Sequence, residues 1–324
     1  MPTPSPLSSA HARSGLYALI FSPIALVLLG SSMVDVQGQT AIGQPLASVE
    51  GLIGMALASI LLALISMNCE ESPAGMIVTS VVSLFIGAAQ FTGFLRIPLL
   101  QSTRIDALDM RAAVVWSLYP VSVTVMTACA AIAIASARHA PTVVDADTPR
   151  RVLREHRHAW VTSATLPLAL LAVVLTIMIA PDDTTSVAAH GLSGLSSSHP
   201  LIPVYGLVIA LIFGCITLMS VHSLTGPQLV AWIVLVIPGY MLVPLWTSLT
   251  GKVATPGYSL STQVSLAAPV LTALGLVLAT TSVGVHWARP RPVAAPEDEG
   301  ETVVKEGPED AVALDDETVT NPSS

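Results

Sequence analysis

Eight long apolar runs, separated by shorter polar segments, dominate this chain of 324 residues. Each run is about 20 residues long, which is the length that an α-helix needs to cross the hydrocarbon core of a bilayer. The runs are apolar all round, as is typical of helices embedded in lipid. They are too long for the strands of a membrane barrel, so the pattern predicts helices. We place the runs at about residues 15–34, 47–67, 75–95, 113–137, 160–180, 201–222, 229–249 and 264–286.

Composition points to the same class of protein. The chain is 52% hydrophobic and 10% charged, whereas a soluble domain carries about 25% charged residues. The sequence therefore predicts an all-α polytopic integral membrane protein. The three cysteines include no CxxC pair, so they predict neither a disulfide framework nor a zinc site, and we expect no cofactor.

One basic segment, residues 138–158, lies between the fourth and fifth runs and carries five arginines. It separates two halves of similar layout, each with four runs. We therefore expect an N-terminal segment at 1–14, a first four-helix half at 15–137, the basic linker at 138–158, a second four-helix half at 159–291 and a tail at 292–324.

The distribution of arginines predicts the orientation, because short cytoplasmic loops are enriched in Lys and Arg. Placing the basic linker inside puts both termini in the cytoplasm, with the first run kept as a signal anchor. We expect the plasma membrane of a bacterium, since arginine outnumbers lysine by 11 to 2. The lipid bilayer, a further membrane protein and anionic lipid headgroups are the partners that this arrangement suggests.

The tail accounts for the net charge of −8, because it holds ten of the 21 acidic residues and one of the 13 basic ones. It has too little apolar content to fold, so we expect it to be disordered. The rest of the chain is nearly neutral and has no extended basic face with aromatic residues, so a nucleic acid is not an expected partner.

The two halves align coarsely, which predicts an internal 4+4 repeat. Pro23 aligns with Pro167, and each half ends in an arginine, at Arg138 and Arg289. Because four spans is an even number, the halves face the same way, and such parallel repeats are related by an axis along the membrane normal.

Two apolar runs are interrupted at corresponding places in the two halves. The interruptions are Gly87, Gln90 and Gly93 in the third run, and Pro238, Gly239, Tyr240 and Pro244 in the seventh. Interrupted spans at matching positions are typical of transporter sites, where Gln90 and Tyr240 would supply the polar lining. The alternative interpretation is kinked helices that pack through small residues and bind nothing.

Basic residues at the predicted membrane surfaces are candidates for headgroup contacts. They are Arg150, Arg151, Arg154 and Arg157 in the basic linker, and Arg104 and Arg111 in the outer loop 96–111. A cation close to the surface contributes about 1 kcal/mol of attraction to anionic lipid. The alternatives are an ordinary topology signal in the linker and a solvated ion-pair face in the outer loop.

No catalytic, nucleotide-binding or metal-binding motif is present, and Asp35 and the other ionisable residues near the spans fall at their predicted ends. The leading interpretation is a non-enzymatic accessory or scaffold subunit of a membrane or cell-envelope assembly. One alternative is a facilitator or flippase-like transporter of an apolar or lipidic solute. Another is a lipid-modifying enzyme that uses the charged groups of loop 96–111 as an acid and base pair.

Overall fold

A computed structural model describes six stretches of the chain, all of which belong to one compact unit, Met1–Pro290. Within them the backbone is helical, and no strand occurs in the described part of the chain. The described stretches are residues 9–41, 48–92, 107–139, 157–181, 201–250 and 259–289.

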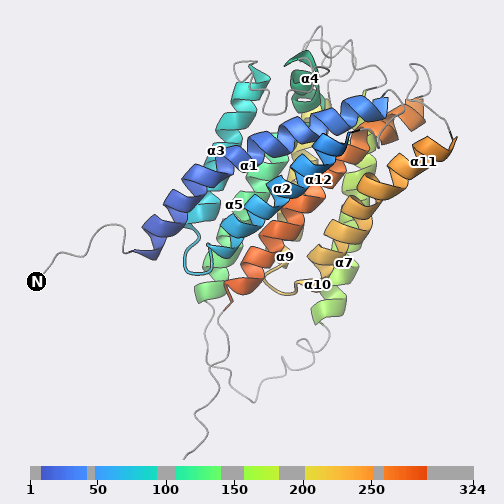
Figure 1. The fold of residues 1–324 in the computed structure, drawn as a ribbon. Helices are drawn as coiled ribbons and strands as arrows, with labels where there is room; N and C mark the ends of the chain where they lie inside the picture. Colours follow the sequence, from blue (N-terminus) through green and yellow to red (C-terminus); the bar gives the residue numbers. More distant parts are fainter. Residues whose placement is uncertain are drawn as a thin grey trace, which may run out of the picture. The chain divides into compact units, whose positions relative to one another are not determined.

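The helices follow one another along both halves of the chain (Figure 1). The first half contains α1 (Ala10–Ala41), α2 (Val49–Met67), α3 (Ala74–Phe91), α4 (Ala107–Ser117) and α5 (Tyr119–His139). The second half contains α7 (Arg157–Ile179), α9 (Ile202–Met219), α10 (Thr225–Leu229), the π-helical segments η3 (Val230–Val236) and η4 (Pro238–Leu242), α11 (Val243–Thr250) and α12 (Ser259–Trp287).

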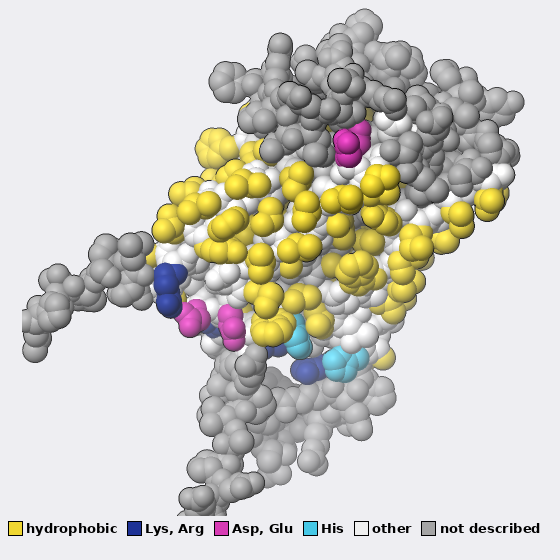
Figure 2. All heavy atoms as spheres, in the orientation of Figure 1, with side chains coloured by type: hydrophobic (Ala, Val, Ile, Leu, Met, Phe, Trp, Pro, Cys, Tyr) yellow, Lys and Arg dark blue, Asp and Glu magenta, His cyan; other side chains and the backbone are white. Residues whose placement is uncertain are grey.

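Eight helical stretches of the described residues are long and apolar enough to cross a membrane, which confirms the prediction of a multi-pass membrane protein. Their outward faces carry large apolar side chains, among them Phe85, Met178 and Met241 at 71%, 62% and 60% exposure. Hydrophobic side chains cover the middle of the face seen in Figure 2, and most charged and histidine side chains lie at its lower end. Such a surface is stable only where lipid, rather than water, surrounds it.

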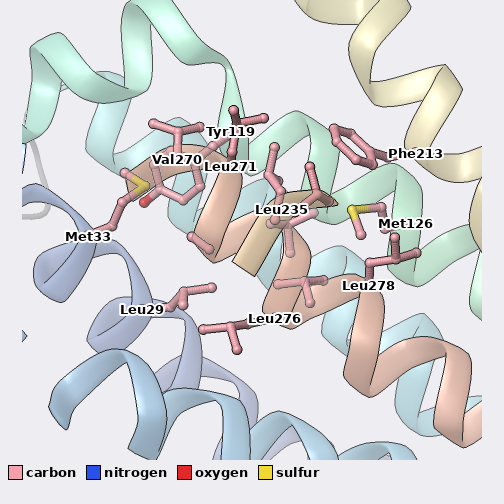
Figure 3. Close-up of a cluster of buried hydrophobic side chains, with 14 of the residues drawn as sticks. Leu29, Met33, Tyr119, Met126, Phe213, Leu235, Val270, Leu271, Leu276 and Leu278 are labelled. Atoms are coloured by element: carbon pink, nitrogen blue, oxygen red, sulfur yellow. The ribbon is translucent and has the colours of Figure 1, made fainter. Parts of the chain in front are cut away.

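Helix α12 runs through the middle of the bundle and contacts α1, α2, α5, α7 and η3. In the first half α1 packs on α2 and α3, and α3 packs on α5. The halves meet where α5 packs on α9 and where α12 packs on α2. The core lies where these helices converge, and Figure 3 shows Leu29, Met126, Phe213 and Leu278 among its buried side chains.

The fourth run was predicted as one helix from residue 113, and this prediction is wrong. Helix α4 ends at Ser117, Leu118 adopts a left-handed backbone conformation with φ of 48°, and α5 starts at Tyr119. The Leu118 side chain fills the space above Gly206 of α9, where an added Cβ would lie 3.2 Å from Leu118 Cβ. This packing stabilises a backbone conformation that non-glycine residues rarely adopt.

The first and seventh spans also differ from their predicted form. Helix α1 continues to Ala41, seven residues past the predicted end of the run. The seventh span begins at Thr225, four residues before the predicted start of the run, and widens into π-helix on both sides of Ile237. Pro238 explains part of this irregularity, because its ring excludes the carbonyl one turn earlier and it has no N–H to donate.

Candidate functional site

The interrupted stretch of α3 is a helix-packing contact in this structure. Gln90 is 2% exposed, and its Oε1 accepts a hydrogen bond of 3.0 Å from the Tyr119 hydroxyl of α5. Gly30 of α1 lies beside both groups, because a Cβ added there would come within 3.2 Å of Gln90 Nε2. Three helices therefore meet at one buried polar pair, which sequence reasoning missed because Tyr119 was not among its candidates.

Gly87 brings α3 and α5 together one turn before Gln90. A Cβ added to Gly87 would lie 2.5 Å from Pro120 Cβ, so no larger residue fits without moving one helix. Gly93 lies outside the described residues. The described part of this stretch therefore fits the interpretation in which small residues let helix backbones approach each other.

The interrupted stretch of the seventh span packs against α12. A Cβ added to Gly239 would lie 2.6 Å from the Ala268 carbonyl oxygen and would collide with Thr272 Oγ1. Pro238 opens η4, and Tyr240 is partly buried against the core. The structure describes the backbone of Pro244 in α11 but not its side chain. No described contact joins Gln90 to Tyr240.

Two surface grooves lie beside these stretches. The first, of about 170 Å³, is lined only by apolar residues of α3, α4 and α5 and by Leu118: Leu84, Gly87, Ala88, Phe91, Val114, Leu118, Pro120 and Val121. The second, of about 450 Å³, lies between the η4–α11 segment and the start of α12: Leu242, Val243, Trp246, Leu260, Ser261, Val264 and Ser265. We call them the α3–α5 groove and the α11–α12 groove.

Asp35 is a buried carboxylate, and it lies within α1 rather than at its end. It is 5% exposed, and Ser48 Oγ donates a hydrogen bond of 2.6 Å to its Oδ2. Ser48 directly precedes α2, so the carboxylate lies at a helix N-terminus, where the partial positive charge of the helix stabilises an anion. Asp35 thus joins α1 to α2.

At the opposite end of the bundle lie the four arginines whose side chains the structure describes: Arg13, Arg138, Arg157 and Arg289. We call this end of the bundle the arginine end. In the first half, His11 Nδ1 lies 2.6 Å from Ser72 Oγ, in the turn between α2 and α3. Arg138, at the end of α5, donates to the carbonyl oxygen of Glu71 in the same turn. These contacts join the start of α1 and the end of α5 to the turn between α2 and α3.

The second half repeats these contacts. His158 Nδ1 lies 2.7 Å from Ser223 Oγ, in the turn between α9 and α10, and Arg289, after α12, donates to the Ser220 carbonyl oxygen. Ser72 and Ser223 also each accept a backbone N–H from two residues further on. The His158 side chain is exposed but hydrogen bonded. Its partner is 65 residues away, which local spacing could not reveal.

The two turns differ in charge. In the first half Glu70 and Glu71 are present, and the Glu71 carboxylate pairs with Arg13 at 2.9 Å. In the second half no described residue of the arginine end is acidic. Burial, followed by the nearby positive charge of Arg157, lowers the pKa of Arg289 below its usual value.

The remaining candidates fall largely outside the described residues. Arg150, Arg151, Arg154 and Arg104 are not described, Arg111 is described by its α4 backbone alone, and most of loop 96–111 is undescribed. Arg157 is the first residue of α7 and is exposed. Among the described residues no group of three His, Cys, Asp or Glu could hold a metal ion. The three cysteines are free.

No protein-family model, no curated protein and no solved structure matches the chain.

Proposed function

We propose that this chain is a non-enzymatic scaffold subunit of a membrane assembly, whose α3–α5 groove receives a transmembrane helix of a partner protein. The observation that carries the proposal is that the polar and small residues of the interrupted spans are already used in internal contacts. Gln90 binds Tyr119, Gly87 packs on Pro120, and Gly239 packs on α12. Of the two surface grooves, the α3–α5 groove is lined, among the described residues, by apolar side chains alone.

The chemistry of the α3–α5 groove suits a helix as its occupant. The small, exposed Ala88 lies in it beside the larger Leu84 and Phe91. Small residues let a second helix approach closely, and van der Waals packing drives helix association in lipid, where no hydrophobic driving force separates the helices from the acyl chains. A solute path would instead need polar groups that face the cavity.

Photocrosslinking in intact membranes tests this proposal. A benzophenone side chain at Ala88, in the groove, should yield one discrete adduct of higher mass that contains a second membrane protein. The matched control is Leu171 of α7, which is 48% exposed on the bundle surface away from either groove. The same adduct pattern at both positions, or lipid adducts alone at Ala88, would refute the scaffold proposal.

A transporter of an apolar or lipidic solute is the second candidate, and the π-helical seventh span favours it. Two π-helical segments flank Ile237 in this span, and such segments frequently occur at functional sites. Their loosened backbone could move during a transport cycle. Transport of a fluorescent lipid by the purified chain in vesicles, lost on substitution of Tyr240, would favour this candidate over the scaffold.

We further propose that residues 15–137 and 159–291 are a parallel repeat, with 138–158 as linker and 292–324 as tail. The matching turns support it, since residues 65–75 and 216–226 align without a gap and share Ile, Ser and Gly at equivalent positions. The buried residues of α7 all correspond to buried residues of α1 at a spacing of 147, the spacing of His11 and His158. The pairing of Pro23 with Pro167 is then one helical turn out of register.

We propose the plasma membrane as the location, with the arginine end and both termini in the cytoplasm. The gathering of Arg13, Arg138, Arg157 and Arg289 at one end of the bundle supports this orientation.

A further inference from the structure

The arginine end of the second half combines basic side chains from three elements. Arg157 begins α7, His222 lies in the α9–α10 turn, and Arg289 follows α12. The Arg289 guanidinium donates a hydrogen bond to the Ser220 carbonyl oxygen in that turn, and it is repelled by the positive charge of Arg157. His158 and His286 belong to the same end, through Ser223 and through the last turn of α12.

The first half provides an internal comparison at equivalent positions. Glu71 precedes Ser72, as His222 precedes Ser223, so a histidine replaces a glutamate at the same place in the turn. In the first half Arg13 has the Glu71 carboxylate as its partner at 2.9 Å. In the second half no described carboxylate pairs with Arg157 or Arg289. Their positive charge is therefore available to an external anion.

Arg289 is only partly exposed, and its Nε is a buried donor with no hydrogen-bond partner among the described residues. A guanidinium offers five N–H donors in a planar fork that matches the oxygens of a phosphate. A partly desolvated cation that lacks a counter-ion is unfavourable, and a bound anion would remove that cost.

We propose that this end binds the phosphate of an anionic phospholipid, held by Arg157, His222 and Arg289. A lipid suits the place better than a soluble anion, because Trp160 and Trp287 flank the cluster at 68% and 41% exposure. Tryptophan rings prefer the headgroup level of a bilayer, and the exposed apolar surface of α7 begins beside Trp160. The inference is independent of the proposed scaffold function and of the orientation of the chain.

Thermal unfolding of the full-length chain in detergent tests the proposal with three ligands at equal phosphate concentration. Phosphatidylglycerol should raise the melting temperature. Phosphatidylcholine, which has similar acyl chains without net charge, should not, and inorganic phosphate, which has the charge without acyl chains, should not. An equal rise with phosphatidylcholine would show that charge is irrelevant, and an equal rise with inorganic phosphate would show that the site is not a lipid site; either result overturns the proposal.

Substitutions then locate the lipid. Arg157→Gln should weaken phosphatidylglycerol binding about fivefold, as expected for one cation at a lipid surface. His222→Glu should weaken binding at least as much. It introduces into the second turn a carboxylate equivalent to Glu71, which neutralises Arg13 in the first half. His222 and Arg157 are exposed, so both variants should fold. Arg13→Gln, in the first half, is the matched control and should leave binding unchanged; wild-type affinity in His222→Glu, or equal losses in Arg13→Gln and Arg157→Gln, would overturn the proposal.

Discussion

The Tyr119 hydroxyl donates a hydrogen bond of 3.0 Å to Gln90 Oε1 in the buried centre of the first half. Gln90 was predicted, with Tyr240, either to line a polar solute site or to pack between helices, and its amide oxygen accepts this bond from a neighbouring helix. An amide buried in hydrocarbon needs a partner, because an unsatisfied polar group there is costly. The pair thus links α3 to α5 at the position where Gly30 brings α1 close.

We predict that Tyr119→Phe and Gln90→Leu each destabilise the folded chain by about 1 kcal/mol, since each removes one interhelical hydrogen bond and leaves a partner group unsatisfied. The double variant should be about as stable as the more destabilised of the two single variants, because both substitutions remove the same hydrogen bond. Thermal unfolding in detergent measures all three. Tyr240→Phe, which has no described hydrogen bond to lose, is the control and should be nearly neutral; additive losses in the double variant would contradict the pairing.

The contact between Gly239 and α12 gives a second prediction. Gly239→Ala should lower the melting temperature, because the new methyl group would lie 2.6 Å from the Ala268 carbonyl oxygen and one of the two helices must move. Gly38→Ala in α1 is the matched control, since nothing lies within 4 Å of a Cβ added there. Alanine is favoured over glycine in a helix by up to about 1 kcal/mol, so Gly38→Ala should be neutral or stabilising. Equal behaviour of the two variants would show that Gly239 is not a close-packing site.

Hydrophobic patterning predicted the eight spans. Each span must form its backbone hydrogen bonds within itself in lipid, so each is visible in the sequence as one long apolar run. It did not predict the break at Leu118, because only the space over Gly206 makes that conformation favourable. The pairs of Gln90 with Tyr119 and of His158 with Ser223 join different helices, and no spacing rule along one helix can specify them. The glycines of the interrupted spans were identified from the sequence, because a small residue can be recognised there. The residues that they pack against could not be identified.

Cys69 provides a prediction about pH. It is buried in the turn at the arginine end, and burial raises the pKa of its thiol, although a hydrogen bond with Ser14 opposes that rise. A raised pKa means less thiolate at neutral pH, so maleimide should react slowly with native Cys69, and faster as the pH rises. The measurement uses a variant in which Cys69 is the sole cysteine. Asn68→Cys, with the native cysteines replaced, is the exposed neighbour and should react rapidly at neutral pH.

The proposed orientation is tested by labelling from one side of the membrane. In a cysteine-free background, a cysteine at Ser196 should react with an impermeant maleimide in intact cells, and a cysteine at Ala146 should react only after lysis. The two positions belong to segments on opposite sides of the fifth span in the proposed topology. Labelling of Ala146→Cys in intact cells would reverse the orientation and place the arginine end outside.

The π-helical seventh span permits a final prediction about the repeat. Gly75, Met76, Thr79 and Ser80 of α3 correspond to buried residues of the seventh span at a spacing of 151, whereas Ser83 and Gly87 correspond to Leu235 and Gly239 at 152. A π-helical turn contains one residue more than an α-helical turn would, and η3 lies where the spacing changes.

Deleting Ile233, an exposed residue of η3, should therefore convert the span to regular α-helix and leave its buried face in register. Deleting Leu171, an exposed residue of the regular helix α7, is the control, because it rotates the rest of that helix by about 100° and should abolish folding. Expression and size-exclusion profiles distinguish the outcomes. If both deletions abolish folding, η3 is not a one-residue insertion into a repeated helix, and the proposed register of the two halves is wrong.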